Sequence, residues 1–106
     1  MDRIDSELTE ILKILPSRVK QTLIDHNQLN SLIEVVLDLG KPAEARFGVG
    51  QSYYIPGEPV TQEDIAFVVG KVGEFTGDNR AGIERTLHRI SAIRSRRGKV
   101  IGLTCR

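Results

Sequence analysis

The first thirty residues carry apolar side chains at helical spacing. Five of them recur at intervals of three or four: Ile4, Leu8, Ile11, Leu12 and Leu15. This pattern predicts an amphipathic helix over residues 3–14. Pro16 ends that helix and can open a second over 17–26, because a first helical turn does not use the N–H that proline lacks. His26 is expected to interact with the free carbonyl groups at the end of the second helix.

From residue 31 the pattern changes to the alternation of a β-strand. The segment is rich in β-branched residues, and four apolar positions are expected on one face: Ile33, Val35, Leu37 and Leu39. A turn at 40–42 leads to a second strand over 43–47, and a loop at 48–50 leads to a short third strand over 52–55. Residues 1–30 are therefore a helical segment, and a sheet begins at residue 31.

A third helix begins at Thr61. The spacing of Thr61 and Asp64 resembles a capping box, in which each residue satisfies a free N–H of the other. Four apolar residues form the stripe expected to be buried: Ile65, Val68, Val69 and Val72. Gly73 is the expected end of the helix, and residues 75–82 are predicted to be a loop.

Residues 83–93 fit two structures. Apolar residues at helical spacing slightly favour a helix over this segment. The Arg96-Arg97-Gly98 turn, followed by the apolar run that begins at Val100, instead favours a β-hairpin.

Composition is that of one globular domain. The chain has 106 residues, of which 40% are hydrophobic and 27% charged. No apolar run approaches the roughly 18 residues that span a bilayer, so no membrane insertion is expected. The single cysteine, Cys105, cannot form an internal disulfide; it is expected to be a small apolar residue of a strand, in a reducing compartment.

Charge is divided unevenly along the chain. Residues 1–77 carry a net charge of −5, and residues 78–106 carry +6. A basic end on an acidic domain indicates a phosphate-rich or acidic partner, or a hairpin that faces the acidic helices or solvent. Four basic residues cluster at the tip of the predicted hairpin and are candidates to contact nucleic acid or an acidic partner: Arg94, Arg96, Arg97 and Lys99.

Catalytic motifs are missing. The Gly-Lys pairs at 40, 70 and 98 are followed by Pro or Val, so none offers the hydroxyl that holds magnesium in a P-loop. The histidines at 26 and 88 and the cysteine at 105 lack metal-ligand spacing. We therefore expect that this chain does not hydrolyse ATP by itself.

Three segments carry a resemblance to a known family. They read LIEVVLDLGKPAEARFG, VTQEDIAFVVGKVGEF and DNRAGIERTLHRISAIRSRRGKVIGLTCR. Together they resemble the cyanobacterial and plastid P-loop ATPases related to stage III sporulation protein AA. The resemblance implies that the chain is a fragment preceding an ATPase core, located in the cytoplasm or the plastid stroma. ATP and magnesium are then expected for the parent protein.

A more distant similarity is to the N-domain of pilus-retraction and secretion ATPases. It implies a PAS-like fold, a strand rather than a helix around residue 89, and packing against neighbouring subunits of a homo-oligomer. Arg89 and Arg106 would then contact the nucleotide of a neighbouring subunit, because the guanidinium fork suits phosphate oxygens.

The predicted fold is a single α+β domain over residues 1–106. It has two N-terminal helices, a mostly antiparallel sheet of about five strands and one packed helix. The predicted function is assembly and coupling within a hexameric ATPase; the alternative is weak, sequence-independent nucleic-acid binding by the basic hairpin.

Overall fold

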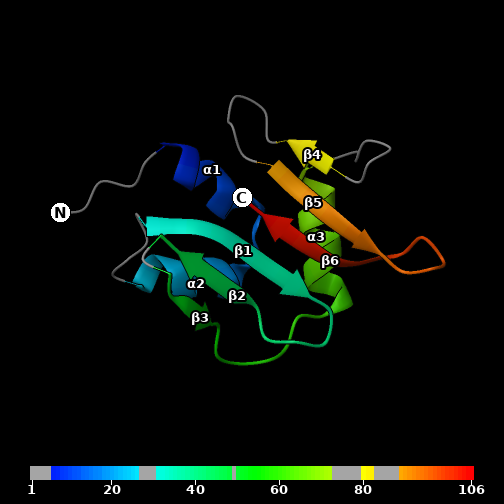
Figure 1. The fold of residues 1–106 in the computed structure, drawn as a ribbon, viewed down its shortest axis with the longest axis horizontal. Helices are drawn as coiled ribbons and strands as arrows, with labels where there is room; N and C mark the ends of the chain where they lie inside the picture. The colour runs from blue at the N-terminus through cyan, green and yellow to red at the C-terminus, as the bar shows by residue number, and fades with distance from the viewer. Residues whose placement is uncertain (1–5, 27–30, 49, 73–79, 83–88) are drawn as a thin grey trace.

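The described residues form three helices and six strands, and the longest strands lie in the middle of one sheet (Figure 1). The computed structural model describes residues 6–26, 31–48, 50–72, 80–82 and 89–106. The helices are α1 (Ser6–Ile14), α2 (Ser17–Asp25) and α3 (Gln62–Val72). The strands are β1 (Leu32–Asp38), β2 (Glu44–Phe47), β3 (Ser52–Tyr54), β4 (Arg80–Gly82), β5 (Arg89–Arg94) and β6 (Val100–Cys105).

The sheet has the strand order β3-β2-β1-β6-β5-β4, and each pair of neighbouring strands is antiparallel. Its centre is the pairing of β1 with β6, which come from opposite ends of the sheet domain. In this pairing Val35 lies opposite Cys105, and Leu37 lies opposite Leu103. All four of these side chains are fully buried. The middle of the sheet therefore depends on contacts between residues far apart in the sequence.

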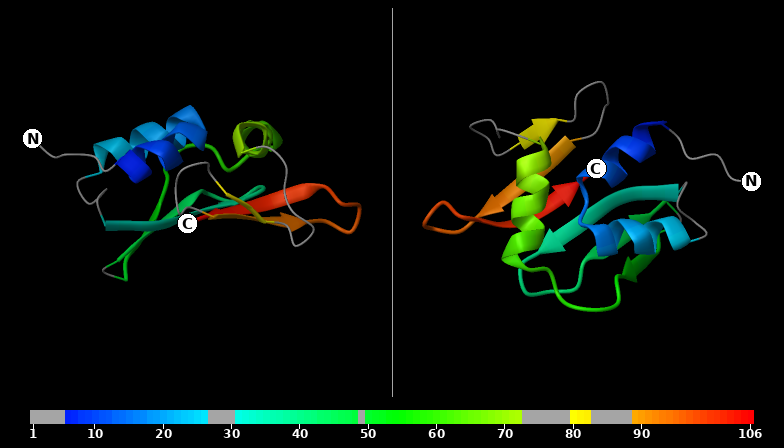
Figure 2. Two further views of the ribbon diagram at one scale, coloured as in Figure 1. Left: turned by 90° about the horizontal axis from the view of Figure 1, so that it is seen from above. Right: turned by 180° about the vertical axis from the view of Figure 1, so that it is seen from behind.

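All three helices lie on the same face of the sheet (Figure 2). Side chains of the helices and of that sheet face make one hydrophobic core. The most deeply buried members from the helices are Val19, Leu23 and Val68, together with Leu15 between α1 and α2. Because β-strand side chains alternate between faces, the other half of each strand points away from this core. In the described part of the chain no helix covers that second face.

The capping box at the start of α3 has the predicted geometry. The Thr61 N–H donates to Asp64 Oδ2 at 2.9 Å, and the Asp64 N–H donates to Thr61 Oγ1 at 3.1 Å. The Arg18 guanidinium of α2 donates to the carbonyls of Glu58 and Pro59 at 2.8 and 3.0 Å and lies 3.0 Å from Asp64 Oδ2. Arg18 thereby joins α2 to the loop and the first turn of α3.

The α+β class, the two N-terminal helices and the terminal hairpin are confirmed. A hydrogen bond of 2.8 Å from the Ser95 N–H to the Lys99 carbonyl closes the hairpin. Gly98, at φ +85°, adopts a left-handed conformation that glycine reaches without strain. The strand interpretation of 83–93 is confirmed for β5, and residues 83–88 lie outside the described residues.

Three details differ from the prediction. The sheet has six strands, because β4 lies in the predicted loop; three residues ending in glycine are too short to show alternation. Ile33 and Leu39 are 51% and 37% exposed, and an irregularity in the β1–β2 register between Leu32 and Glu34 takes Ile33 out of the alternation. The ring of His26 stacks on Phe47, with centroids 4.7 Å apart, a contact that the sequence prediction did not include.

Cys105 occupies the apolar strand position predicted for it. Its side chain is fully buried in β6, opposite Val35 and Ile90. Burial raises the pKa of the Cys105 thiol to about 12, because the thiolate would lose its hydration. The thiol therefore remains protonated in the folded protein near neutral pH.

Replacing Thr61 tests the capping box. Thr61→Ala removes the acceptor of the Asp64 N–H and is expected to lower the free energy of unfolding by about 1 kcal/mol. Thr61→Ser keeps the hydroxyl and is the matched control. Urea unfolding followed by circular dichroism measures both variants; an alanine variant as stable as the serine variant would show that the cap contributes nothing.

Candidate functional site

The face of the sheet opposite the helices carries most of the charged strand residues. We call it the open face and define it by the outward side chains Glu34, Asp38, Glu44, Arg46, Arg89, Ile93 and Thr104, together with Arg106 directly after β6. The register places Glu34 opposite Arg46 on β2, while Thr104 lies between Val36 and Ser91. The open face therefore crosses all the central strands.

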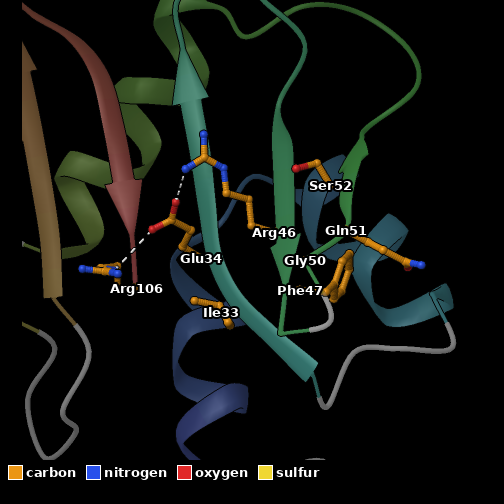
Figure 3. A pocket seen from close by; sticks show the side chains of 8 residues that line it. All are labelled: Ile33, Glu34, Arg46, Phe47, Gly50, Gln51, Ser52 and Arg106. Carbon is orange, nitrogen blue, oxygen red and sulfur yellow. Dashed lines mark hydrogen bonds and ion pairs between the residues drawn. The ribbon is translucent and has the colours of Figure 1, made fainter.

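One end of the open face is organised around a buried carboxylate (Figure 3). Arg46 Nη1 donates to Glu34 Oε2 at 2.6 Å, and Arg106 Nε lies 3.3 Å from Glu34 Oε1. The Glu34 side chain is only 11% exposed, whereas those of Arg46 and Arg106 are 51% and 69% exposed. A buried carboxylate is costly unless it is paired and hydrogen-bonded, and the two arginines supply both kinds of contact to Glu34.

A second carboxylate extends this arrangement along β2. Arg46 Nε donates to Glu44 Oε2 at 3.3 Å. A hydrogen bond from Ser52, and then the one from Arg46, lower the pKa of Glu44. The hydrogen bond and charge of Glu44, and then the hydrogen bond to Glu34, raise the pKa of Arg46. We call Glu34, Glu44, Arg46 and Arg106 the Glu34 cluster; it links β2, β1 and the end of β6 by ion pairs.

A hollow of about 240 Å³ lies beside the Glu34 cluster. Ile33 and Phe47 supply its apolar wall, and Gln51 and Ser52 supply further polar groups (Figure 3). Both arginines at this hollow already face Glu34, so their charge is largely compensated within the chain. The arrangement is suited to joining strands more than to binding a strong anion.

The structure brings together Arg89 and Arg106, the two arginines that the resemblance to secretion ATPases selected as nucleotide contacts. Arg89 and Arg106 exchange two main-chain hydrogen bonds, of 3.1 and 2.9 Å, and so lie directly opposite each other. Glu34 and Arg46 were missed. The available signal was a lone carboxylate within the β-branched run of β1, which is unusual for a strand at the centre of a sheet.

The four basic residues of the hairpin lie at the other end of β5 and β6. Arg94 Nη1 donates to the Gly98 carbonyl at 2.9 Å, so this side chain folds back on the turn. Arg96, Arg97 and Lys99 are exposed on a loop that projects from the body of the protein (Figure 1). Residues 89–106 contain six basic residues and no acidic one. The hairpin is thus a strongly cationic projection, separate from the Glu34 cluster.

A second hollow, of about 350 Å³, lies at the base of this hairpin. It is lined by Asp38, Leu39, Lys41, Ile93 and Ile101. Ile93 is 51% exposed there. A Cβ added to Gly102 would lie 2.8 Å from Asp38 Oδ1, so the missing side chain at this position lets the Asp38 carboxylate rest on β6. We call this the hairpin hollow.

Metal and membrane sites find no support in the parts of the chain that the structure covers. Within residues 6–26, 31–48, 50–72, 80–82 and 89–106, no three His, Cys, Asp or Glu side chains gather as metal ligands. None of the helices described there has the length and apolar character needed to cross a bilayer.

Fold and site together define an α+β domain whose described helices cover one sheet face and leave the other, charged face uncovered. The chain is similar to the uncharacterized protein ycf45 of Porphyra purpurea, at 50% identity over 97% of this chain and 18% of that protein. It is 52% identical to SEEDLING PLASTID DEVELOPMENT 1 of Arabidopsis thaliana over 94% of this chain and 14% of that protein. The ycf45 protein of Cyanidium caldarium is 38% identical, over 97% of this chain and 30% of that protein.

The chain spans between 14% and 30% of the lengths of these curated relatives. No family model matches the sequence. No solved structure matches it either. The predicted cyanobacterial or plastid distribution agrees with these relatives, and the predicted location in the cytoplasm or plastid stroma is confirmed at that level by their plastid association.

The family prediction is wrong. The relatives are ycf45 and SEEDLING PLASTID DEVELOPMENT 1 proteins, which are not small N-domains of sporulation or secretion ATPases. The predicted function, assembly and coupling within a hexameric ATPase, depended on that resemblance and is therefore wrong as well. The alternative prediction, a nucleic-acid-binding hairpin, is not supported by the names of these relatives. Their names describe no enzyme. The expected ATP and magnesium of a parent protein, and the nucleotide contacts of Arg89 and Arg106, stay untested predictions.

Replacing Glu34 tests whether the Glu34 cluster holds the sheet together. Glu34→Gln keeps the shape but removes the charge that faces Arg46 and Arg106, and it is expected to lower the free energy of unfolding by about 1–2 kcal/mol. Glu10→Gln, which removes an exposed partner of Lys13, is the control and should change it by less than about 0.5 kcal/mol. Equal losses in the two variants, measured by urea unfolding, would contradict a structural role for the cluster.

Proposed function

We propose that this chain is a protein-interaction domain that binds an acidic segment of a partner protein on its basic hairpin and the adjoining open face. The observation that carries the proposal is the cluster of basic side chains at the hairpin tip, Arg94, Arg96, Arg97 and Lys99, with no acidic residue between positions 89 and 106, beside a sheet face that no described helix covers. Opposite charges on two surfaces steer their encounter and set their orientation. The proposal extends the sequence prediction of an acidic partner for Arg94, Arg96, Arg97 and Lys99.

Exposed apolar side chains among the charges support a protein partner. Ile33, Tyr54 and Ile93 are 51%, 60% and 51% exposed on or beside the open face. Protein interfaces combine apolar and aromatic side chains with arginine in this way. Proteins that bind single-stranded nucleic acid instead present several aromatic rings for base stacking, and Tyr54 is the one large exposed aromatic on the described open face.

The relatives supply the setting for this proposal. One of them is named for plastid development in seedlings, and all are several times longer than this chain. We propose that the domain acts in a plastid or cyanobacterial protein of that kind and docks its acidic partner there. The chemistry of the surface specifies a partner segment of negative charge.

Charge reversal at the hairpin tip tests the proposal. Fluorescein-labelled decaglutamate is expected to bind the chain at low salt and to dissociate as salt is added, because exposed charges are screened beyond about 10 Å at 0.1 M ionic strength. The double variant Arg96→Glu with Arg97→Glu should lose this binding by at least about tenfold. Lys13→Glu with Lys71→Glu makes the same charge change on the helices and should lose clearly less.

Fluorescence anisotropy measures all three proteins, with labelled oligothymidine as a second probe. An equal loss in the helix variant would show that only net charge matters. Binding of oligothymidine without decaglutamate would assign the surface to nucleic acid and overturn the proposal.

A further inference from the structure

We propose that the hairpin hollow receives one aliphatic side chain of the acidic segment, so that the domain recognises an apolar anchor flanked by acidic residues. This inference rests on the proposed function and names the ligand more closely. The hollow, lined by Leu39, Ile93 and Ile101 with Asp38 and Lys41 at its rim, has the volume of a small ligand pocket.

The apolar lining is the first support. Ile93, near the end of β5, and Leu39, directly after β1, are 51% and 37% exposed in the isolated chain. Covering such surface removes apolar area from water, which is favourable in proportion to the area covered. An aliphatic side chain placed between them would bury both at once.

The position of Asp38 determines where the charges of the ligand lie. Its carboxylate rests on Gly102 at the hollow, so an acidic ligand residue placed there would meet a like charge. The anchor is therefore uncharged, and the acidic residues lie outside the hollow. Arg94, next to Ile93, folds back on the turn, and the exposed cations beyond it are Arg96, Arg97 and Lys99.

The order of residues along the hairpin gives the order of groups in the ligand. Ile93 lies one residue before the end of β5, and Arg96 and Arg97 lie on the turn that the Ser95 and Lys99 main chains close. A segment lying from the hollow toward this turn would thus carry its acidic residues beside its apolar anchor.

The other hollow of the open face fits such an anchor less well. Beside the Glu34 cluster, Arg46 and Arg106 already face the Glu34 carboxylate at 2.6 and 3.3 Å. Cationic side chains engaged in this way offer less charge to a ligand. Ile33 lines that hollow with the same 51% exposure as Ile93, so it provides a matched comparison on the same face.

Two peptides and two variants test the inference. Decaglutamate is compared with the same peptide carrying leucine in place of one central glutamate, both labelled and measured by anisotropy. The leucine peptide is expected to bind about tenfold more tightly, because its side chain becomes buried. Ile93→Thr should abolish that preference and leave the affinity for decaglutamate unchanged, whereas Ile33→Thr should preserve it.

The outcomes separate this inference from the proposed function. Equal affinity for the two peptides, or loss of the preference in Ile33→Thr and not in Ile93→Thr, would overturn the anchor site while leaving acidic-segment binding in place. Failure of both peptides to bind would overturn the proposed function itself. Both substitutions replace exposed residues by another β-branched residue, so both variants should fold.

Discussion

The pairing of β1 with β6 is the constraint on which the rest of the structure depends. It joins the first strand of the sheet to the last, in a register that places Val35 opposite Cys105 and Leu37 opposite Leu103. These side chains form the sheet side of the core, against which the helices pack. A shift of one residue would turn every side chain of a strand to the other face and expose these apolar residues, so burial specifies the register strongly.

The same pairing builds the open face. Once Val35 and Cys105 face the helices, their neighbours Glu34 and Arg106 must face away, and they form an ion pair across the strands. Arg46 reaches the same carboxylate from β2. At the opposite end of β6, the hairpin carries its basic residues away from the sheet. The result is a sheet face with internally paired charge at one end and, beyond its other end, a hairpin that exposes Arg96, Arg97 and Lys99.

Local signals in the sequence were sufficient to predict most of the fold. Pro16, the Thr61 and Asp64 pair, and the Arg96-Arg97-Gly98 turn each act within a few residues, and each is confirmed. The missed features depend on pairing between distant segments. The three-residue strand β4 exists because β5 offers it an edge, and the exposure of Ile33 follows from an irregular register with β2.

The candidate site was predictable only in part, for the same reason. The cluster of arginines at the hairpin tip could be read directly from four neighbouring positions, and Arg89 and Arg106 were selected through a family resemblance that the relatives contradict. Glu34 and Arg46 become partners only through the β1–β2 register. The hairpin hollow forms only because β6 pairs with both β1 and β5 and so brings Leu39 and Ile93 to one site. Composition and residue spacing do not specify these long-range contacts.

If the open face and its hairpin form the binding surface, their residues should respond when a ligand is added. Amide chemical shifts of the isotopically labelled chain measure this response as the leucine-bearing acidic peptide is titrated in. We expect the largest shift changes on β5, β6, the hairpin between them and Leu39. Changes confined to α1, α2 and α3, or no changes at saturating peptide, would show that the ligand does not bind this surface.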